Sequence, residues 1–186
     1  MPRDELTFRV GTSADAPRCA ALLIEGFETY RAFAPPNWTP PTIEEETANL
    51  VSRLDRPEVW AMLAEQGPEL AGYVAIMPAA ASYRAVPDPG LAHFWQLFVR
   101  PPWWGSGLAT RLHTESIAAA RGRGYTAIRL FTPAGHERAR RFYEREGWSR
   151  FTAPFFDDRI GFDVVEYRAA LTHRPSDRVG DRLGGA

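Results

Sequence analysis

Apolar residues recur along the 186-residue chain with two different periods, and their order predicts the elements of the fold. Residues 6–10 alternate between apolar and polar positions, which is typical of a half-buried strand. Capping residues and a proline start a helix that runs to about residue 30, and four prolines mark a loop over 31–41. Thr42, with Glu45 three positions later, predicts the start of a second helix to about 54. The same signals predict strands over 59–64, 70–77 and 92–99, a helix over 107–121, a strand over 125–131, a helix over 136–146, and strands over 148–153 and 161–170.

This order alternates strand–helix–strand units with hairpins. It predicts an α/β fold with a mixed sheet and helices on both faces. The length suits one domain, which we place at residues 1–171, followed by a polar tail over 172–186 that we expect to be flexible.

Composition excludes several kinds of chemistry. The chain has no lysine, which removes Schiff-base catalysis and a P-loop lysine. Its single cysteine and the absence of Cys/His spacing predict no metal site and fit a reducing, cytoplasmic setting. A formal net charge of -1 without a basic stripe argues against a nucleic-acid partner, and no apolar run is long enough to predict a membrane span.

A glycine turn between the strand over 92–99 and the next helix is the most informative segment. Gly105 and Gly107 can adopt backbone angles closed to other residues and allow a ligand to approach closely. The N–H groups and dipole of the helix start favour an anion such as a pyrophosphate. A plain turn has the same Gly-x-Gly pattern, and the third glycine of a dinucleotide fingerprint is missing, so the neighbouring residues decide.

The turn resembles motif A of the GNAT superfamily of N-acetyltransferases, in which Arg/Gln-Gly-x-Gly-x-Gly/Ala follows a strand that ends in valine and then a proline. Here the motif reads Trp104-Gly105-Ser106-Gly107-Leu108-Ala109, behind Val99 and Pro101. Trp104 stands in place of the usual Arg or Gln, which removes one phosphate contact. Arg100 or Arg111 could supply that charge instead, and Arg138, Arg140 and Arg141 could be a solvated face or meet the 3′-phosphate.

A second segment, residues 136–148, is similar to the family pattern Asn-x-x-Ala-x-x-Phe-Tyr-x-x-x-Gly-Phe, with His136 in place of Asn and Trp148 in place of Phe. The resemblance covers about residues 6–170. It implies the GNAT fold, with about seven strands, helices on both faces and a splayed pair of central parallel strands.

The resemblance also implies acetyl-CoA as co-substrate. The residues expected to bind it are Leu97, Phe98, Val99, Trp104, Gly105, Ser106, Gly107, Leu108, Ala109 and His136. A backbone N–H near Phe98 or Val99 would polarise the thioester carbonyl. Tyr143 is expected to donate a proton to the departing thiolate, since a phenol with a pKa of about 10 stays protonated at pH 7.

Attack by an amine also needs a proton acceptor. His93 lies four residues before Leu97, where relatives of this fold carry Glu or His, and an imidazole with a pKa of about 6.5 suits the task. Glu25 and Glu28, at the end of the first long helix, are the alternatives.

The acceptor is expected to bind beneath the loop over 30–41, against Phe33, Trp38 and Trp95. A hydrophobic or aromatic amine, from a small molecule or a peptide, fits these rings better than a polyamine. The expected reaction is direct acetyl transfer to a primary amine in a ternary complex. The alternatives are a non-catalytic acyl-CoA-binding module and transfer of a larger acyl group, and the family resemblance also allows a homodimer.

Overall fold

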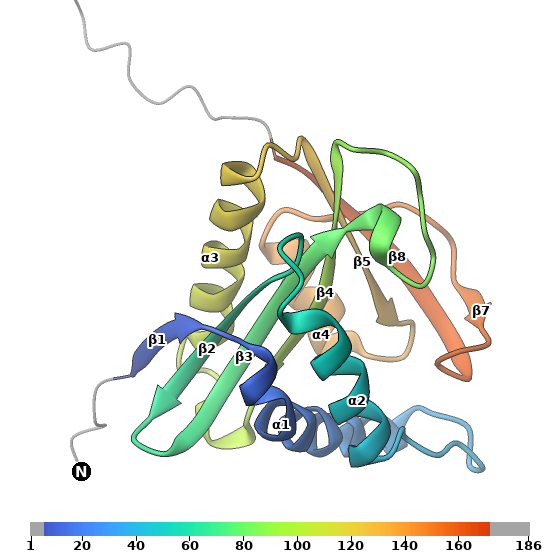
Figure 1. Ribbon diagram of the computed structural model, residues 1–186. Helices are drawn as coiled ribbons and strands as arrows, with labels where there is room; N and C mark the ends of the chain where they lie inside the picture. The colour runs from blue at the N-terminus through green and yellow to red at the C-terminus, as the bar shows by residue number, and fades with distance from the viewer. Residues whose placement is uncertain (1–5, 172–186) are drawn as a thin grey trace, which may run out of the picture.

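Eight strands of the computed structural model, which describes residues 6–171, form one twisted mixed sheet (Figure 1). The strand order is β1-β2-β3-β4-β5-β8-β6, with β7 paired to β8. All neighbouring strands are antiparallel except β4 and β5. The strands are β1 (Thr7–Val10), β2 (Trp60–Gln66), β3 (Glu69–Pro78), β4 (Leu91–Val99), β5 (Ala127–Pro133), β6 (Ser149–Arg150), β7 (Phe155–Asp157) and β8 (Phe162–Ala170).

Four α-helices cover the two faces of this sheet: α1 (Ala16–Glu28), α2 (Ile43–Leu54), α3 (Leu108–Gly122) and α4 (Glu137–Arg145). Leu23 of α1 and Leu50 of α2 share one core cluster with Tyr73 of β3. Leu112 of α3 shares the other cluster with Val74, the next residue of β3. Successive strand residues point to opposite faces, so an almost wholly buried β3 supplies both cores.

The start of α2 confirms the predicted capping box. Glu45 donates its backbone N–H to the Thr42 hydroxyl over 3.2 Å, and its carboxylate accepts the backbone N–H of Thr42 over 2.8 Å. These reciprocal bonds satisfy two donors that the first helical turn leaves free. They fix the point at which the proline-rich loop ends.

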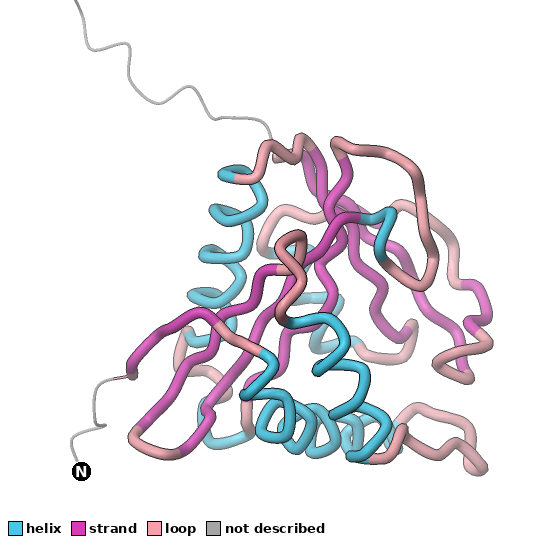
Figure 2. The backbone as a smooth tube through the Cα atoms, in the orientation of Figure 1, coloured by secondary structure: helices cyan, strands magenta, loops and turns pink. Residues whose placement is uncertain are grey.

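The parallel strands β4 and β5 separate soon after they meet (Figure 2). They pair only over Leu91–His93 and Ala127–Arg129. Beyond that point β4 continues along β3 to Val99, and β5 continues along β8 to Pro133. The register of β3 and β4 shifts between Ala75 and Ile76, so Trp95 lies in a bulge on β4. The splayed pair implied by the family resemblance is therefore present.

The sheet has one strand more than the expected seven. The chain between 148 and 161 forms the two-residue strand β6 and the three-residue strand β7 rather than one strand over 148–153. Both pair with β8. The tail expected over 172–186 lies outside the described residues. Among residues 6–171 no helix is both long and apolar enough to cross a membrane.

Candidate active site

The gap between β4 and β5 exposes backbone groups that could bind an extended ligand. Arg100, the residue after β4, donates its backbone N–H to the carbonyl of Ala71 in β3, so the backbone of Arg100 faces β3. Because an antiparallel ladder alternates its hydrogen-bonded residues, the backbone groups of Val99 and Leu97 point to the opposite edge, which faces the gap. Phe98 pairs with Tyr73 of β3, and its ring packs edge-on against Phe27 of α1 while it also lines the cavity.

The glycine turn lies beyond the end of β4 and has the conformation that the motif requires. Gly105 and Gly107 have φ angles of 77° and 88°, and Gly107 is the N-cap of α3. Ser106 holds the turn by donating its hydroxyl to the carbonyl of Trp103 and accepting the N–H of Leu108. Within the described residues the N–H groups of Ala109 and Thr110 have no acceptor, so they remain available to an anion at the helix start.

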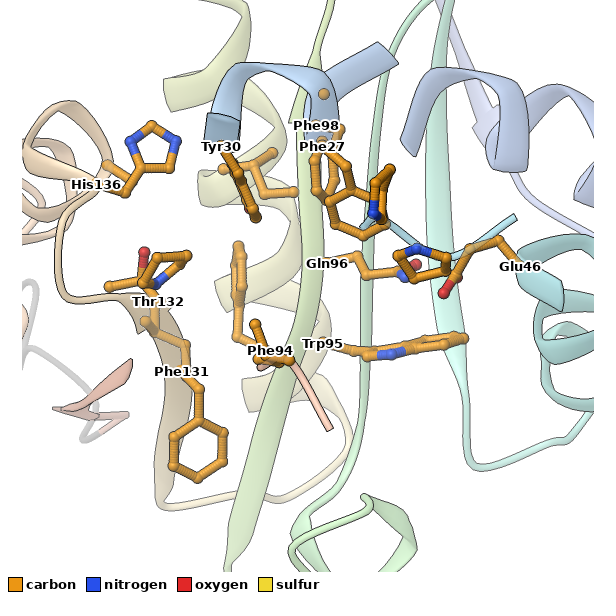
Figure 3. A pocket seen from close by; sticks show the side chains of 18 of the residues that line it. Phe27, Tyr30, Glu46, Phe94, Trp95, Gln96, Phe98, Phe131, Thr132 and His136 are labelled. Carbon is orange, nitrogen blue, oxygen red and sulfur yellow. The ribbon is translucent and has the colours of Figure 1, made fainter. Parts of the chain in front are cut away.

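A cavity of about 680 Å³ runs through the gap to both sides of β4. This volume lies in the range of small-molecule and cofactor sites. In Figure 3, Gln96, Trp95 and Glu46 lie on one side of β4, whereas Phe131, Thr132 and His136 lie on the other. We call the part between β4, β5 and α4 the β5 half, and the part between β4 and α2 the α2 half. Leu97, Phe98 and Val99 lie between them.

Trp104 is the one residue of the predicted glycine motif that lines this cavity within the described residues. Its indole N–H donates to the carbonyl of Val99 over 2.7 Å, and the residue is 42% exposed. The guanidinium of Arg138, from α4, lies 3.4 Å from the centre of that ring and also lines the cavity. The guanidinium of Arg138 is thus held at the cavity by an aromatic face, and its donors could bind an anion there.

The two arginines expected to replace the motif's missing charge are engaged elsewhere. Arg100 forms ion pairs with Glu25 and Glu69, and Arg111 lies over Phe8. Arg138 has no carboxylate within ion-pair distance among residues 6–171. Among the arginines considered from the sequence, Arg138 is therefore the one that remains available to an anion at the cavity. Arg140 donates to the hydroxyl of Tyr167 and to the carbonyl of Ala134. Arg141 donates to the carboxylate of Glu137.

His136 is the N-cap of α4 and lines the cavity. Its ring contacts Tyr30 and Phe33, each with centroids 5.4 Å apart. Burial, helped by the charge of Arg138, lowers its pKa to about 4, so the imidazole is neutral at pH 7. Phe33 supports His136 and Phe162 from behind and does not line the cavity, in contrast to Trp38 and Trp95.

Tyr143 projects from α4 into the β5 half and is 8% exposed. Its ring is held edge-on by Phe94 and Trp148. Its hydroxyl has no hydrogen-bond partner within residues 6–171. Burial raises the pKa of the phenol well above its usual value, so the hydroxyl stays protonated and free to donate.

His93 lines the cavity where β4 and β5 part, but it is only 3% exposed. Burial, together with the nearby charges of Arg129 and Arg53, lowers its pKa to about 3. Its Nδ1 atom is buried without a partner. The imidazole is thus neutral at pH 7 and is a weak proton acceptor.

Of the carboxylates considered from the sequence, neither reaches the cavity. Glu25 lies 3.4 Å from Arg100, and Glu28 lies at 2.5 Å from Arg31 on the outer surface. Glu46 of α2 does line the α2 half, and Figure 3 shows it pointing toward Gln96. Burial raises the pKa of Glu46, while a hydrogen bond from Asn49 and the charge of Arg159 act against that shift.

Sequence reasoning missed Glu46 and Gln96, although each carries a signal. Gln96 is a lone amide within the apolar run from Phe94 to Phe98 of a central strand. Its side-chain oxygen is buried without a hydrogen-bond partner, which is costly unless a ligand satisfies it. Glu46, Asn49 and Arg53 share one face of α2 at i, i+3 and i+7, and all three line the cavity.

These features define a class of α/β proteins in which two neighbouring parallel strands diverge and a glycine turn begins the helix that follows the first of them. A model of the acetyltransferase (GNAT) family matches residues 23–148. The chain therefore belongs to the GNAT family of acetyltransferases. A comparison with curated protein sequences gave no match.

Solved structures share the fold at low sequence identity. An acetyltransferase from Thermus thermophilus is 22% identical, with a TM-score of 0.64 over 91% of this chain and 99% of that one. PaiA N-acetyltransferase from Thermoplasma acidophilum, solved with coenzyme A, is 14% identical, with a TM-score of 0.67 over 87% of this chain and 98% of that one. The ribosomal-protein-S18-alanine N-acetyltransferase from Escherichia coli is 17% identical, with a TM-score of 0.63 over 97% of this chain and 100% of that one.

Proposed function

We propose that this protein transfers an acetyl group from acetyl-CoA to a primary amine by direct attack in a ternary complex. The observation that carries the proposal is the divergence of β4 from β5 after His93, which opens one continuous cavity to both sides of β4. A thioester in the gap would be reachable by an amine from the α2 half. No covalent enzyme intermediate is then needed.

The residues present fit acetyl-CoA along its length. The outward-facing backbone of Leu97 and the N–H of Val99 suit the amides of a pantetheine arm, while the carbonyl of Val99 is engaged by Trp104. The turn at Gly105–Gly107 suits the diphosphate. A Cβ built on either glycine meets nothing within 4 Å, so the turn leaves open space on that side. Arg138 adds a cation at the same end, where motif A would otherwise supply one.

The chemistry requires two proton movements. As the amine nitrogen bonds to the carbonyl carbon, the carbon–sulfur bond breaks and the amine loses a proton. Tyr143 gives its phenolic proton to the departing thiolate, because its hydroxyl is protonated and has no partner within the described residues. A backbone N–H of Val99 or Leu97 polarises the carbonyl.

We assign the acceptance of the amine proton to Glu46 rather than to His93. Glu46 lines the α2 half, and its raised pKa makes it a better base than an ordinary surface carboxylate. His93 lies at the same opening, but its pKa of about 3 makes it a poor acceptor at pH 7. His93 instead helps to shape the floor of the cavity.

Purified protein mixed with acetyl-CoA and a panel of primary amines, with release of free thiol as the readout, tests the proposal. We expect turnover that depends on both partners, and the Glu46→Gln variant should lose about 10²-fold in kcat. His93→Gln should lose much less than Glu46→Gln. If the two losses were reversed, His93 would be the base. An absence of turnover with tight coenzyme A binding would favour a non-catalytic acyl-CoA module, and preference for succinyl-CoA would indicate a larger acyl donor.

A further inference from the structure

The α2 half of the cavity carries an excess of positive charge. Its lining includes the guanidinium groups of Arg53 and Arg159, and neither has a carboxylate within ion-pair distance among residues 6–171. Two carboxylates line the same half. Glu45 is engaged with the backbone N–H of Thr42 in the capping box, which leaves Glu46 as the one carboxylate facing two arginines.

Both arginines are held over aromatic rings that line the cavity. Arg53 lies 5.6 Å from the ring centre of Trp95 and donates to Asn49 and to the carbonyl of Ala81. Arg159 lies 5.2 Å from the ring centre of Tyr83. An arginine held on an aromatic face loses little freedom when its remaining donors bind a ligand.

The segment that carries Arg159 is fixed against the cavity. The indole N–H of Trp38 donates to the carbonyl of Ile160 over 2.7 Å. Asp157 accepts from the backbone N–H groups of Arg159 and Ile160 and forms an ion pair with Arg84. The turn between β7 and β8 therefore holds Arg159 opposite α2, and the lining charges come from two separate sides of the same space.

Another part of this half is suited to a nitrogen. Gln96 presents a buried side-chain oxygen without a partner, and Figure 3 shows the Glu46 side chain pointing toward it. A carboxylate and an amide oxygen are acceptors, and an amine supplies donors. A simple cationic amine would satisfy this part but would be repelled by the two arginines, and a polyamine would be repelled more.

We propose that the acceptor is an amine that also carries a carboxylate, with its nitrogen held by Glu46 and Gln96 and its carboxylate bound by Arg53 and Arg159. The inference rests on the proposed acetyl transfer, and it narrows the acceptor to aminocarboxylates. Trp95, Tyr83 and Trp38 surround the space between the charged groups with aromatic surface. The body of the acceptor is accordingly apolar.

Matched pairs of amines test this choice: phenylalanine with phenethylamine, tyrosine with tyramine, and tryptophan with tryptamine. We expect kcat/KM to be at least about tenfold higher for the member that keeps its carboxylate, the size of effect that charged hydrogen bonds produce. In Arg159→Gln the ratio of the two kcat/KM values within each pair should fall toward one, mainly because KM rises for the member that carries the carboxylate. Turnover of the decarboxylated member should be retained.

Arg56→Gln is the matched control, since Arg56 is an exposed arginine just past the end of α2 whose side chain donates to Ser52 and does not line the cavity. Its ratios should equal those of the unmodified protein. Equal kcat/KM within the pairs, preference for the decarboxylated members, or no turnover of any acid would overturn the inference. Calorimetry with coenzyme A separates this failure from that of the proposed function, because coenzyme A binding does not depend on Arg159.

Discussion

At the residue scale, the two tyrosines near α4 separate a chemical role from a structural one. Tyr143 presents a hydroxyl without a partner in the described residues to the cavity, whereas the fully buried Tyr167 donates its hydroxyl to Glu144 over 2.7 Å and accepts from Arg140. The sequence motif identified Tyr143. Its ring contacts come from Phe94 of β4 and from Trp148 just past the end of α4, and their geometry could not be predicted from spacing.

Tyr143→Phe is expected to lower kcat by about 10²-fold and to leave coenzyme A affinity unchanged, because the thiolate loses its proton donor while the ring remains. Steady-state kinetics and calorimetry measure the two effects. Tyr167→Phe is the control: it should cost about 1.5–3 kcal/mol of stability through a lost charged hydrogen bond and leave kcat near that of the unmodified protein. Equal kcat in both variants would remove Tyr143 from the mechanism.

His93 predicts a pH dependence of stability. Its pKa is about 3 in the folded protein and about 6.5 when exposed, so between these values the unfolded chain binds a proton that the folded chain does not. The free energy of unfolding must therefore fall as the pH is lowered from 7 to 5, by about 2 kcal/mol from this residue. His93→Gln should remove that part of the decrease in chemical denaturation measured at both pH values. A variant with an unchanged decrease would show that His93 titrates normally in the folded state.

At the scale of elements, the long strands and helices followed from periodicity and caps, whereas short or irregular pieces did not. The strand β7 has three residues and depends on β8 for its partner, so no local pattern marks it. The bulge at Trp95 is equally hidden, because a register shift depends on the neighbouring strand. Glu46 comes from α2, Gln96 from β4 and Arg159 from the turn between β7 and β8, and only the folded chain brings them to one cavity.

The glycine turn gives a prediction at this scale. Gly107 has a φ angle of 88°, so Gly107→Ala should cost about 1–2 kcal/mol of stability and should weaken coenzyme A binding at least tenfold by shifting the N–H groups of the turn. Gly122→Ala is the control: Gly122 is the last residue of α3, lacks a positive φ angle and has open space around it, so alanine should stabilise the helix by up to about 1 kcal/mol. Calorimetry and thermal melting measure both. Unchanged coenzyme A affinity in Gly107→Ala would exclude the turn from the phosphate site.

At the scale of the whole molecule, the sheet consists of two parts joined by a narrow connection. Strands β1–β4 and β5–β8 are each extensively paired, but only three residue pairs link β4 to β5. Order and topology were expected from the alternation of elements and from the family resemblance. The position at which the two strands part was not, since it depends on how each strand pairs on its other side.

A ligand that bridges the two parts should stabilise the whole. Coenzyme A at 100 times its dissociation constant should add about 2.7 kcal/mol. For a protein of this size that corresponds to an increase in melting temperature of roughly 5–10 °C. Gly107→Ala at the same coenzyme A concentration should show a smaller increase. An increase of the same size in both proteins would mean that the ligand binds away from the glycine turn.

The separation of β4 from β5 also affects how the ligand-free protein can aggregate. A strand edge with free donors and acceptors is a template on which any other extended segment can assemble, including one from a second molecule. Residues 94–99 of β4 form such an edge in the middle of the sheet, where neither lysines nor a second strand protect it. The concentration of coenzyme A would then control how readily newly made molecules aggregate. Depletion of coenzyme A would cause aggregation as well as loss of activity.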